Sequence, residues 1–322
     1  MMKKTLVALA AVVAAGGAFA QSTLTGEISY GFSSETAANS TLSGFGLEAA
    51  DFTIATAEDI EGVGKVAVSM NFDGSGGRGS NATTGDMTLG LTLTNGLAIK
   101  GGSTKGGSYL GQGLASAGSA YEINMSGKIL GSRTSNDFIS LAMPLMEGTK
   151  VTYTHTEADV AIGTGSASAL NTTTQAYDTI SLDYTAGALA ANVQARTYNQ
   201  QVASSTSSAS SRSRAAASYD LGVAKIGAGV ENTNYMYGNS KSDSAFGLTI
   251  PMGALNIGGQ AVSTSTSGNA TASSNYTRTG AMFGGIYNLS KRTYAYAQYY
   301  SYDAGSTVSN TSGYIFGMYN TF

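Results

Sequence analysis

The sequence predicts an all-β fold, a 16-stranded antiparallel transmembrane β-barrel. Three observations predict it: period-two alternation recurs along the chain, charged residues make up only 11%, and short turn signals alternate with long polar stretches. Soluble domains usually carry about 25% charged residues, whereas a strand that touches lipid excludes charge from one face. The 43 glycines and the many serines and threonines are also poor helix formers.

Residues 1–20 have the three parts of a secretory signal peptide. Two lysines at 3–4 form a positive start, an apolar run follows at 6–15, and AFA at 18–20 is a cleavage signal. The alternative, a membrane anchor, is disfavoured because the apolar run is too short to span a bilayer. We therefore expect a signal peptide over 1–20 and one barrel domain over 21–322, exported across the inner membrane.

The mature chain is mildly acidic and contains no cysteine. Without the two lysines of the signal peptide, 15 basic residues remain against 20 acidic ones, a net charge of −5. No basic patch is available to neutralise phosphates, so nucleic acid is not expected as a partner. The absence of cysteine excludes disulfides and thiol chemistry.

The alternation is clearest in four segments: TLTGEISYGF (23–32), VGKVAVSMNF (63–72), TISLDY (179–184) and ALAANVQARTY (188–198). In TISLDY, isoleucine, leucine and tyrosine share one face, and threonine, serine and aspartate share the other. A soluble β-sandwich also alternates. Here, however, the polar face is rich in serine, threonine and glycine, and such segments recur over the whole chain.

Turn signals give the number of strands. Short ones lie at 58–64, 94–97, 144–149, 185–188, 220–225, 251–254 and 288–293. Long polar stretches lie near 33–43, 73–84, 104–135, 157–175, 199–211, 235–242, 263–275 and 303–312. Seven short turns and eight long loops predict 16 strands, with the short turns periplasmic and the long loops extracellular. Closure of the sheet is expected because lipid tolerates no unpaired strand edge.

Aromatic residues mark the end of the chain. In SGYIFGMYNTF (312–322), Tyr314, Phe316, Met318 and Phe322 share the phase predicted to face lipid. Tyrosines are plentiful in the closing strands, at Tyr287, Tyr294, Tyr296, Tyr299, Tyr300, Tyr302, Tyr314 and Tyr319. Tyrosine is typical of the lipid headgroup level, where the ring is buried and the hydroxyl stays wet, so we expect them there. Packing within a soluble sheet is the alternative.

No constellation of residues predicts catalysis or a metal site. His155 is the only histidine, so no multi-histidine metal site can form. A hydrolase would need a Ser-His pair and an orienting residue, and no G-x-S-x-G motif stands out. Asp51, Glu58 and Asp59 could be read as a calcium cluster, but they are expected to be strand and turn residues. We therefore expect no enzyme, no metal and no cofactor.

Five motifs follow one another in an order that is specific, although each is weak alone. They are QSTLTGEISYGF (21–32), AEDIEGVGKVAVSMNF (57–72), NDFISLAMPLMEGTKVTYTH (136–155), YNLSKRTYAYAQYYSYD (287–303) and GMYNTF (317–322). In this order and spacing the chain resembles the general trimeric porins of Gram-negative bacteria, in particular their β-proteobacterial and neisserial branch. The resemblance covers the mature chain and is loosest in the middle.

The resemblance implies a homotrimer in the outer membrane, in contact with its lipid and lipopolysaccharide. It implies that the third extracellular loop folds into the barrel lumen, and 104–135 stands in that place. The implied function is passive diffusion of ions and small hydrophilic solutes. A substrate-selective channel, for phosphate or a sugar, is an alternative. A structural or adhesive barrel is a further one, disfavoured because 16 strands enclose more space than side chains fill.

The sequence departs from the family in its basic residues. Asp51 and Gly102 stand at arginine positions of the family, and Ala55 stands at a lysine position. Glu122 is the clear carboxylate of the third loop, and Arg133 is one residue out of register with a family arginine. By strand phase and loop position, the candidate pore-lining residues are Glu27, Asp51, Lys65, Lys100, Glu122, Arg133, Asp183, Arg196, Arg212, Arg214 and Arg278. We expect weak ion selectivity, and its sign stays open.

Overall fold

The computed structural model describes residues 21–38, 40–74, 83–106, 110, 113–117, 129–130, 134–157, 175–199, 208–268, 275–303 and 310–322. The predicted signal peptide, Glu122 and Arg133 lie outside the described residues. Within those ranges the chain forms 16 strands and one 3-10 turn, η1 (Gly113–Ser116). None of the described segments is a helix with the length and apolar character needed to cross a membrane.

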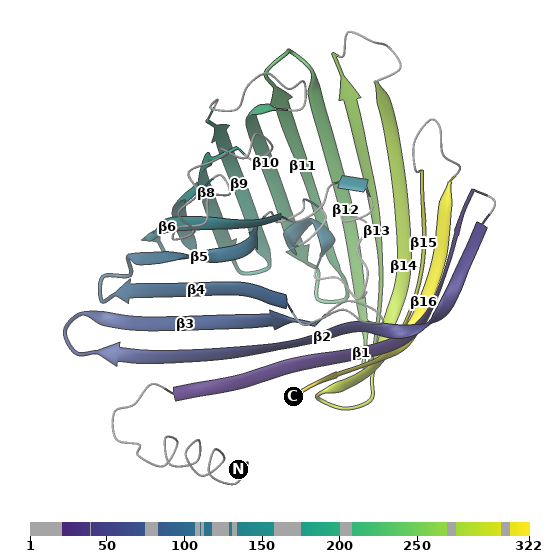
Figure 1. The fold of residues 1–322 in the computed structure, drawn as a ribbon, viewed down its shortest axis with the longest axis horizontal. Helices are drawn as coiled ribbons and strands as arrows, with labels where there is room; N and C mark the ends of the chain where they lie inside the picture. The colour runs from purple at the N-terminus through teal and green to yellow at the C-terminus, as the bar shows by residue number, and fades with distance from the viewer. Residues whose placement is uncertain are drawn as a thin grey trace.

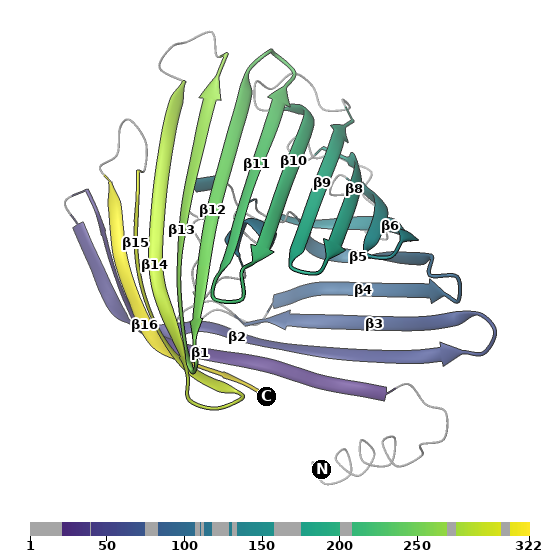
Figure 2. The ribbon, with the colours of Figure 1, turned by 180° about the vertical axis from the view of Figure 1, so that it is seen from behind.

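The strands are β1 (Gln21–Ala37), β2 (Ser40–Ile60), β3 (Gly64–Asp73), β4 (Thr83–Leu93), β5 (Ala98–Gly106), β6 (Thr134–Met146), β7 (Thr149–Thr156), β8 (Tyr177–Ala186), β9 (Leu189–Tyr198), β10 (Ala209–Asp220), β11 (Lys225–Tyr235), β12 (Ser240–Met252), β13 (Leu255–Ser267), β14 (Tyr276–Asn288), β15 (Thr293–Tyr302) and β16 (Thr311–Thr321). Each strand pairs with the next in the chain, so the sheet is an antiparallel meander (Figures 1 and 2).

The sheet closes on itself because the first strand pairs with the last. β1 and β16 are antiparallel partners from Glu27↔Thr321 to Ala37↔Thr311, and they lie side by side in Figure 1. Two further backbone bonds join Gly26 and Phe322 at 3.0 and 2.9 Å. The closed barrel therefore has no free sheet edge, and the prediction of a 16-stranded antiparallel barrel is confirmed.

The first loop, between β1 and β2, is shorter than the sequence predicts. The polar stretch near 33–43 predicts a long loop, but β1 runs to Ala37 and β2 begins at Ser40, with Ala37 and Ser40 paired. The prediction is wrong because serine and threonine occur in strands as well as in loops. Threonine is β-branched and suits a strand. Thr36 and Thr41 in fact join their hydroxyls across the hairpin at 2.9 Å.

The two faces of the barrel differ in polarity, and the apolar face is the outer one. In β11, Val230 is 50% exposed, whereas its neighbour Glu231 is only 6% exposed. The same alternation exposes large apolar side chains on strands around the barrel, among them Ile28, Leu89, Ile180, Val193, Phe246 and Phe283. Buried polar side chains such as Ser29 and Gln298 lie on the opposite phase. An apolar outer band with a polar interior is the pattern of a barrel in lipid.

Neighbouring residues at the middle of β8 provide a test of this polarity. Leu182 lies on the outer face and Ser181 on the inner face, because Leu182 pairs with Val193 and Ser181 with Gln194. We expect Leu182→Arg to destabilise the barrel by about 2–4 kcal/mol, since arginine then enters lipid near the bilayer midplane. Ser181→Arg should cost much less. Urea unfolding in lipid vesicles measures both, and equal costs would contradict the assignment of the faces.

Candidate functional site

The strand register places nine candidate residues on the inner face. Residues that are Cα partners share a face, and buried Ser29 and Glu231 define the inner phase in β1 and β11. In register with these, the following point inward: Glu27, Asp51, Lys65, Lys100, Asp183, Arg196, Arg212, Arg214 and Arg278. Their placement follows from the period of the strand, which the sequence already shows.

A stack of guanidinium groups and tyrosine rings lies on the inner wall of β8, β9 and β10. Arg196 and Arg212 are Cα partners on β9 and β10. The Cζ atom of Arg196 lies 3.9 Å from the ring centroid of Tyr177 and 5.8 Å from that of Tyr198. The Cζ atom of Arg212 lies 5.9 Å from the ring centroid of Tyr198. Arg196 also donates from Nε to Thr179 Oγ1 at 3.1 Å, so hydrogen bonding and cation–π contacts fix its orientation.

A buried ion pair adjoins this stack. Arg214 donates from Nε to Glu231 Oε2 at 2.6 Å, and Arg212 Nε lies 3.5 Å from Glu231 Oε1. The side chains of Arg214 and Glu231 are 8% and 7% exposed, whereas that of Arg212 is 28% exposed. Glu231 thus holds Arg214 against the wall, whereas Arg212, which also donates from Nε to Thr233 Oγ1 at 3.3 Å, stays partly exposed.

The wall formed by β1, β2, β15 and β16 carries carboxylates that accept bonds from tyrosine hydroxyls. Tyr319 donates to Glu27, and Tyr296 donates to Glu48. Tyr300 donates to Glu35 at 2.7 Å. These bonds join the first two strands to the last two, across the point where the barrel closes.

This arrangement corrects the prediction that the closing tyrosines lie at the headgroup level. Tyr287, Tyr299 and Tyr314 are outward and exposed. The inward members of the set are Tyr294, Tyr296, Tyr300, Tyr302 and Tyr319. Tyrosine is amphipathic and suits either place, so composition could not separate them. The glutamates of β1 and β2 favour the inward position of these tyrosines, because they supply hydrogen-bond acceptors inside the barrel.

The inner wall of β2 to β5 is lined mainly by small side chains. A hollow of about 810 Å³ lies against it, between Thr23 on β1 and Lys100 on β5. Its inward lining includes Ala55, Ala57, Lys65, Ala67, Ser69, Thr88, Gly90 and Ala98. Small residues therefore occupy the wall on which the sequence showed alanine and glycine in place of the family's lysine and arginine.

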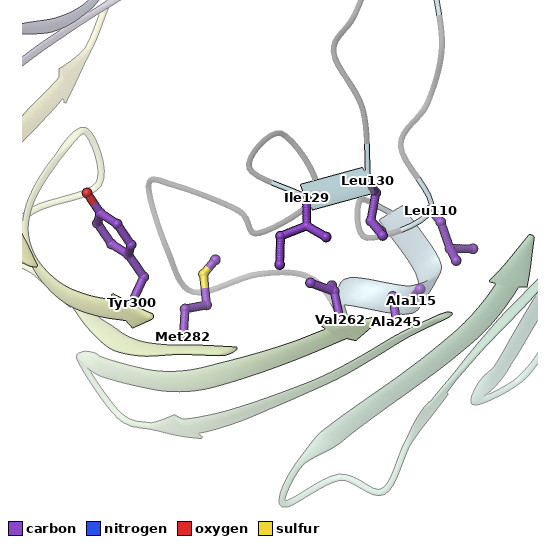
Figure 3. Close-up of a cluster of buried hydrophobic side chains, with 8 residues drawn as sticks. All are labelled: Leu110, Ala115, Ile129, Leu130, Ala245, Val262, Met282 and Tyr300. Atoms are coloured by element: carbon purple, nitrogen blue, oxygen red, sulfur yellow. The ribbon is translucent and has the colours of Figure 1, made fainter. Parts of the chain in front are cut away.

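The described parts of the third long stretch pack against the inner wall of β10 to β15. A Cβ atom added to Gly247 on β12 would lie 2.5 Å from Ser116 C and 2.6 Å from Ala115 O of η1. Lys241 Nζ donates to the carbonyl of Leu130 at 3.0 Å and to Asp243 Oδ2 at 2.8 Å. Figure 3 shows the apolar part of this contact, formed by Leu110, Ala115, Ile129, Leu130, Ala245, Val262, Met282 and Tyr300.

A polar inner wall inside a closed apolar barrel is the architecture of an outer-membrane channel, and sequence comparison gives its family. Residues 5–307 match the family model of the Gram-negative porins. The chain belongs to this family. It is a passive diffusion channel of the outer membrane. The narrower neisserial branch stays a prediction. No curated protein sequence matches the chain.

Solved structures resemble this porin in fold. The anion-selective porin from Comamonas acidovorans has a TM-score of 0.71 and 19% identity, and the match covers 94% of this chain and 100% of that one. OmpF of Salmonella typhi, in complex with daunomycin, has a TM-score of 0.72 and 11% identity, and the match covers 94% of this chain and 97% of that one. The trimer form of OmpT of Vibrio cholerae has a TM-score of 0.69 and 10% identity, and the match covers 94% of this chain and 100% of that one.

His155 of the porin lies on the outer face of β7, away from the interior. Its Nδ1 lies 2.8 Å from Asp178 Oδ1 and its Nε2 lies 3.1 Å from Glu157 Oε1, while Tyr153 donates to Asp178 at 2.6 Å. Both ring nitrogens are therefore engaged by carboxylates. Within the described ranges no group of three or more histidine, cysteine, aspartate or glutamate residues is arranged to hold a metal ion.

Several inward residues of the porin were not predicted from the sequence. Glu48 is the extra residue of a β-bulge, because Ser29 pairs with Ala49 and Tyr30 pairs with Leu47. Simple alternation from Asp51 would have placed Glu48 outward, so no sequence signal could have found it. Lys241 and Asp243, by contrast, alternate along β12 in SKSDSAF, and strand phase could have identified them.

Proposed function

We propose that ions and small hydrophilic solutes diffuse through the space enclosed by the barrel, past the charged side chains of its inner wall. The observation that carries this is a closed 16-stranded barrel with a polar inner face. About eight strands give an interior that side chains can fill, whereas 16 to 18 leave an aqueous channel. Diffusion down a gradient needs no cofactor and no energy source.

The third long stretch, 104–135, is proposed to narrow the pore. Its described residues cover the inner wall from β10 to β15, where Gly247 lets η1 approach the strand backbone. The solute path then runs along the opposite wall, past Lys65 and Lys100 and the hollow of about 810 Å³. Glu122 and Arg133, as members of the same stretch, are proposed to contribute charge where the pore is narrowest.

Clusters of opposite charge face each other across the barrel. Glu27, Glu35 and Glu48 lie on β1 and β2, and Arg196 and Arg212 lie on β9 and β10. In a barrel of 16 strands, β1 and β9 are eight strands apart and therefore on opposite walls. Because the path passes between walls of opposite sign, both cations and anions find a favourable side, which supports weak net selectivity.

The porin is further proposed to act as a homotrimer that contacts lipid and lipopolysaccharide and catalyses no reaction. One of its structural neighbours is a trimer, and its apolar outer band provides the surface that lipid or a second subunit requires. His155 lies on the outer face, and both of its ring nitrogens are engaged by carboxylates, so neither is placed to take a proton from a nucleophile. These points support a channel rather than an enzyme.

A substrate-selective channel for a sugar is less well supported. Such a channel would present aromatic ring faces along its path. Tyr296 and Tyr300, the central inward tyrosines of β15, are only 4% and 3% exposed. Their rings are packed against the wall and hydrogen-bonded to Glu48 and Glu35, so they offer little surface to a solute.

Single-channel recording of the purified mature protein in a planar bilayer tests the proposed function. Stepwise conductance is expected, with steps in groups of three if the unit is a trimer. A salt gradient across the bilayer gives the sign of selectivity from the reversal potential. Folding is checked separately by heat-sensitive electrophoretic migration. Correctly folded protein that inserts and never conducts would overturn the diffusion channel and favour a structural or adhesive barrel.

A further inference from the structure

Arg196 and Arg212 are an unusual cross-strand pair. Like charges directly opposite one another on adjacent strands are destabilising, yet these two residues are Cα partners on the inner wall. Within the described part of the chain, Arg196 makes no ion pair with a carboxylate. Its side-chain nitrogens donate instead to the hydroxyls of Thr179 and Tyr198, at 3.1 and 3.4 Å.

Aromatic rings contact both guanidiniums. Tyr177 and Tyr198 are themselves in contact, with ring centroids 5.3 Å apart, and Tyr198 is nearly buried at 9% exposure. Arg196 lies over both rings and Arg212 lies near Tyr198. A guanidinium stacked on a ring keeps N–H donors at its edge. Two N–H donors of Arg196 are used for Thr179 and Tyr198, and its other donors remain for a ligand.

The local charge is positive. Glu231 is the carboxylate that contacts both Arg212 and Arg214, and its Cα partner Asp243 is paired with Lys241. With Arg196, four cationic side chains therefore stand beside two carboxylates in this part of the wall. Arg214 is buried in that contact, whereas Arg212 keeps 28% of its side chain exposed. The excess positive charge is therefore presented by Arg196 and Arg212.

We propose that Arg196 and Arg212 form a binding subsite for multivalent oxyanions on the inner wall. Each planar guanidinium fork matches two oxygens of a phosphate or carboxylate group, so an anion with two charged groups can bridge the pair and offset their repulsion. Both residues lie toward the ends of β9 and β10 that adjoin the long loop at 199–211, predicted to be extracellular. The subsite rests on the proposed channel function, because the anion must enter the lumen to reach it.

Pyrophosphate is the probe that tests the subsite. Single-channel current of the full mature chain is recorded in potassium chloride while pyrophosphate is added on the side of the long loops. We expect concentration-dependent block of the wild-type channel. Arg196→Gln and Arg212→Gln should each raise the blocking concentration roughly tenfold, because each removes charged hydrogen bonds to the anion. Arg196→Lys should also weaken the block, since lysine keeps the charge but lacks the planar fork.

Lys225→Gln is the matched control, because it removes one positive charge from the same phase at the far end of β11. Its block should equal that of the wild type. Two outcomes would overturn the subsite: Lys225→Gln weakens the block as much as the arginine variants do, or Arg196→Lys is blocked as strongly as the wild type. Either outcome would mean that the net positive charge of the lumen, and not a specific site, causes the block. A wild-type channel that conducts but is never blocked also overturns it and leaves the channel function standing, whereas absent conductance contradicts the channel function itself.

Binding by the detergent-solubilised barrel provides a second readout that does not need conductance. A ligand that binds the folded state raises the unfolding midpoint. Pyrophosphate is expected to raise it for the wild type and for Lys225→Gln, and to raise it less for Arg196→Gln and Arg212→Gln. An equal rise in all four proteins would overturn the assignment of the subsite to these arginines.

Discussion

Replacing Lys241 by methionine is expected to destabilise the barrel by about 3–5 kcal/mol, because a buried carboxylate then loses its cation. Asp243 is only 3% exposed in its side chain, and Lys241 Nζ lies 2.8 Å from its Oδ2. The same ammonium donates to the carbonyl of Leu130, so the substitution also removes a tether between the third long stretch and β12. The midpoint of urea unfolding in lipid vesicles measures the loss of stability.

Two further variants show whether the buried charge is the cause. Lys65→Met removes an exposed lysine from the opposite inner wall and should change stability by less than about 0.5 kcal/mol. Lys241→Met combined with Asp243→Leu should regain most of the lost stability, since the carboxylate that lost its cation is then also removed. If Lys241→Met alone unfolds at the wild-type midpoint, the ion pair does not stabilise the barrel.

Gly247→Ala is expected to change both stability and conductance. The new methyl group would lie 2.5–2.6 Å from the backbone of Ala115 and Ser116, so either η1 or β12 must shift. Overpacking of this kind costs about 1–3 kcal/mol. Because η1 lies on the inner wall, its displacement should alter single-channel conductance. A loss of packing elsewhere in the barrel would lower stability without changing conductance.

Gly90→Ala is the control for this effect. Gly90 lies on the inner face of β4, and a Cβ atom there would meet its nearest neighbour, Ile99 O, at an ordinary 3.6 Å. This variant should keep the stability of the wild type, and because it displaces no backbone segment, its conductance should change much less than that of Gly247→Ala. An unchanged conductance in Gly247→Ala would show that η1 does not lie beside the solute path.

Much of this protein could be predicted from its sequence because the strand period is regular. Successive side chains alternate between faces, so the alternation alone predicts the inward phase of Arg196, Asp183 and Lys100. The turn signals predict the number of strands for the same local reason. Strand boundaries are harder to predict where serine and threonine fill both strands and loops, as at the hairpin between β1 and β2.

Features that depend on contacts between distant strands could be seen only in the tertiary structure. The bulge opposite Ser29 and Tyr30 turns Glu48 inward, and a single extra residue of this kind leaves no mark in the alternation. The tyrosines of β15 and β16 point inward because their acceptors lie on β1 and β2, 248 to 292 residues away in the chain. The sequence by itself thus determined a barrel with a polar interior, since polarity repeats locally along each strand. Closure of the barrel decided which charges meet, because it brings together residues that no local pattern relates.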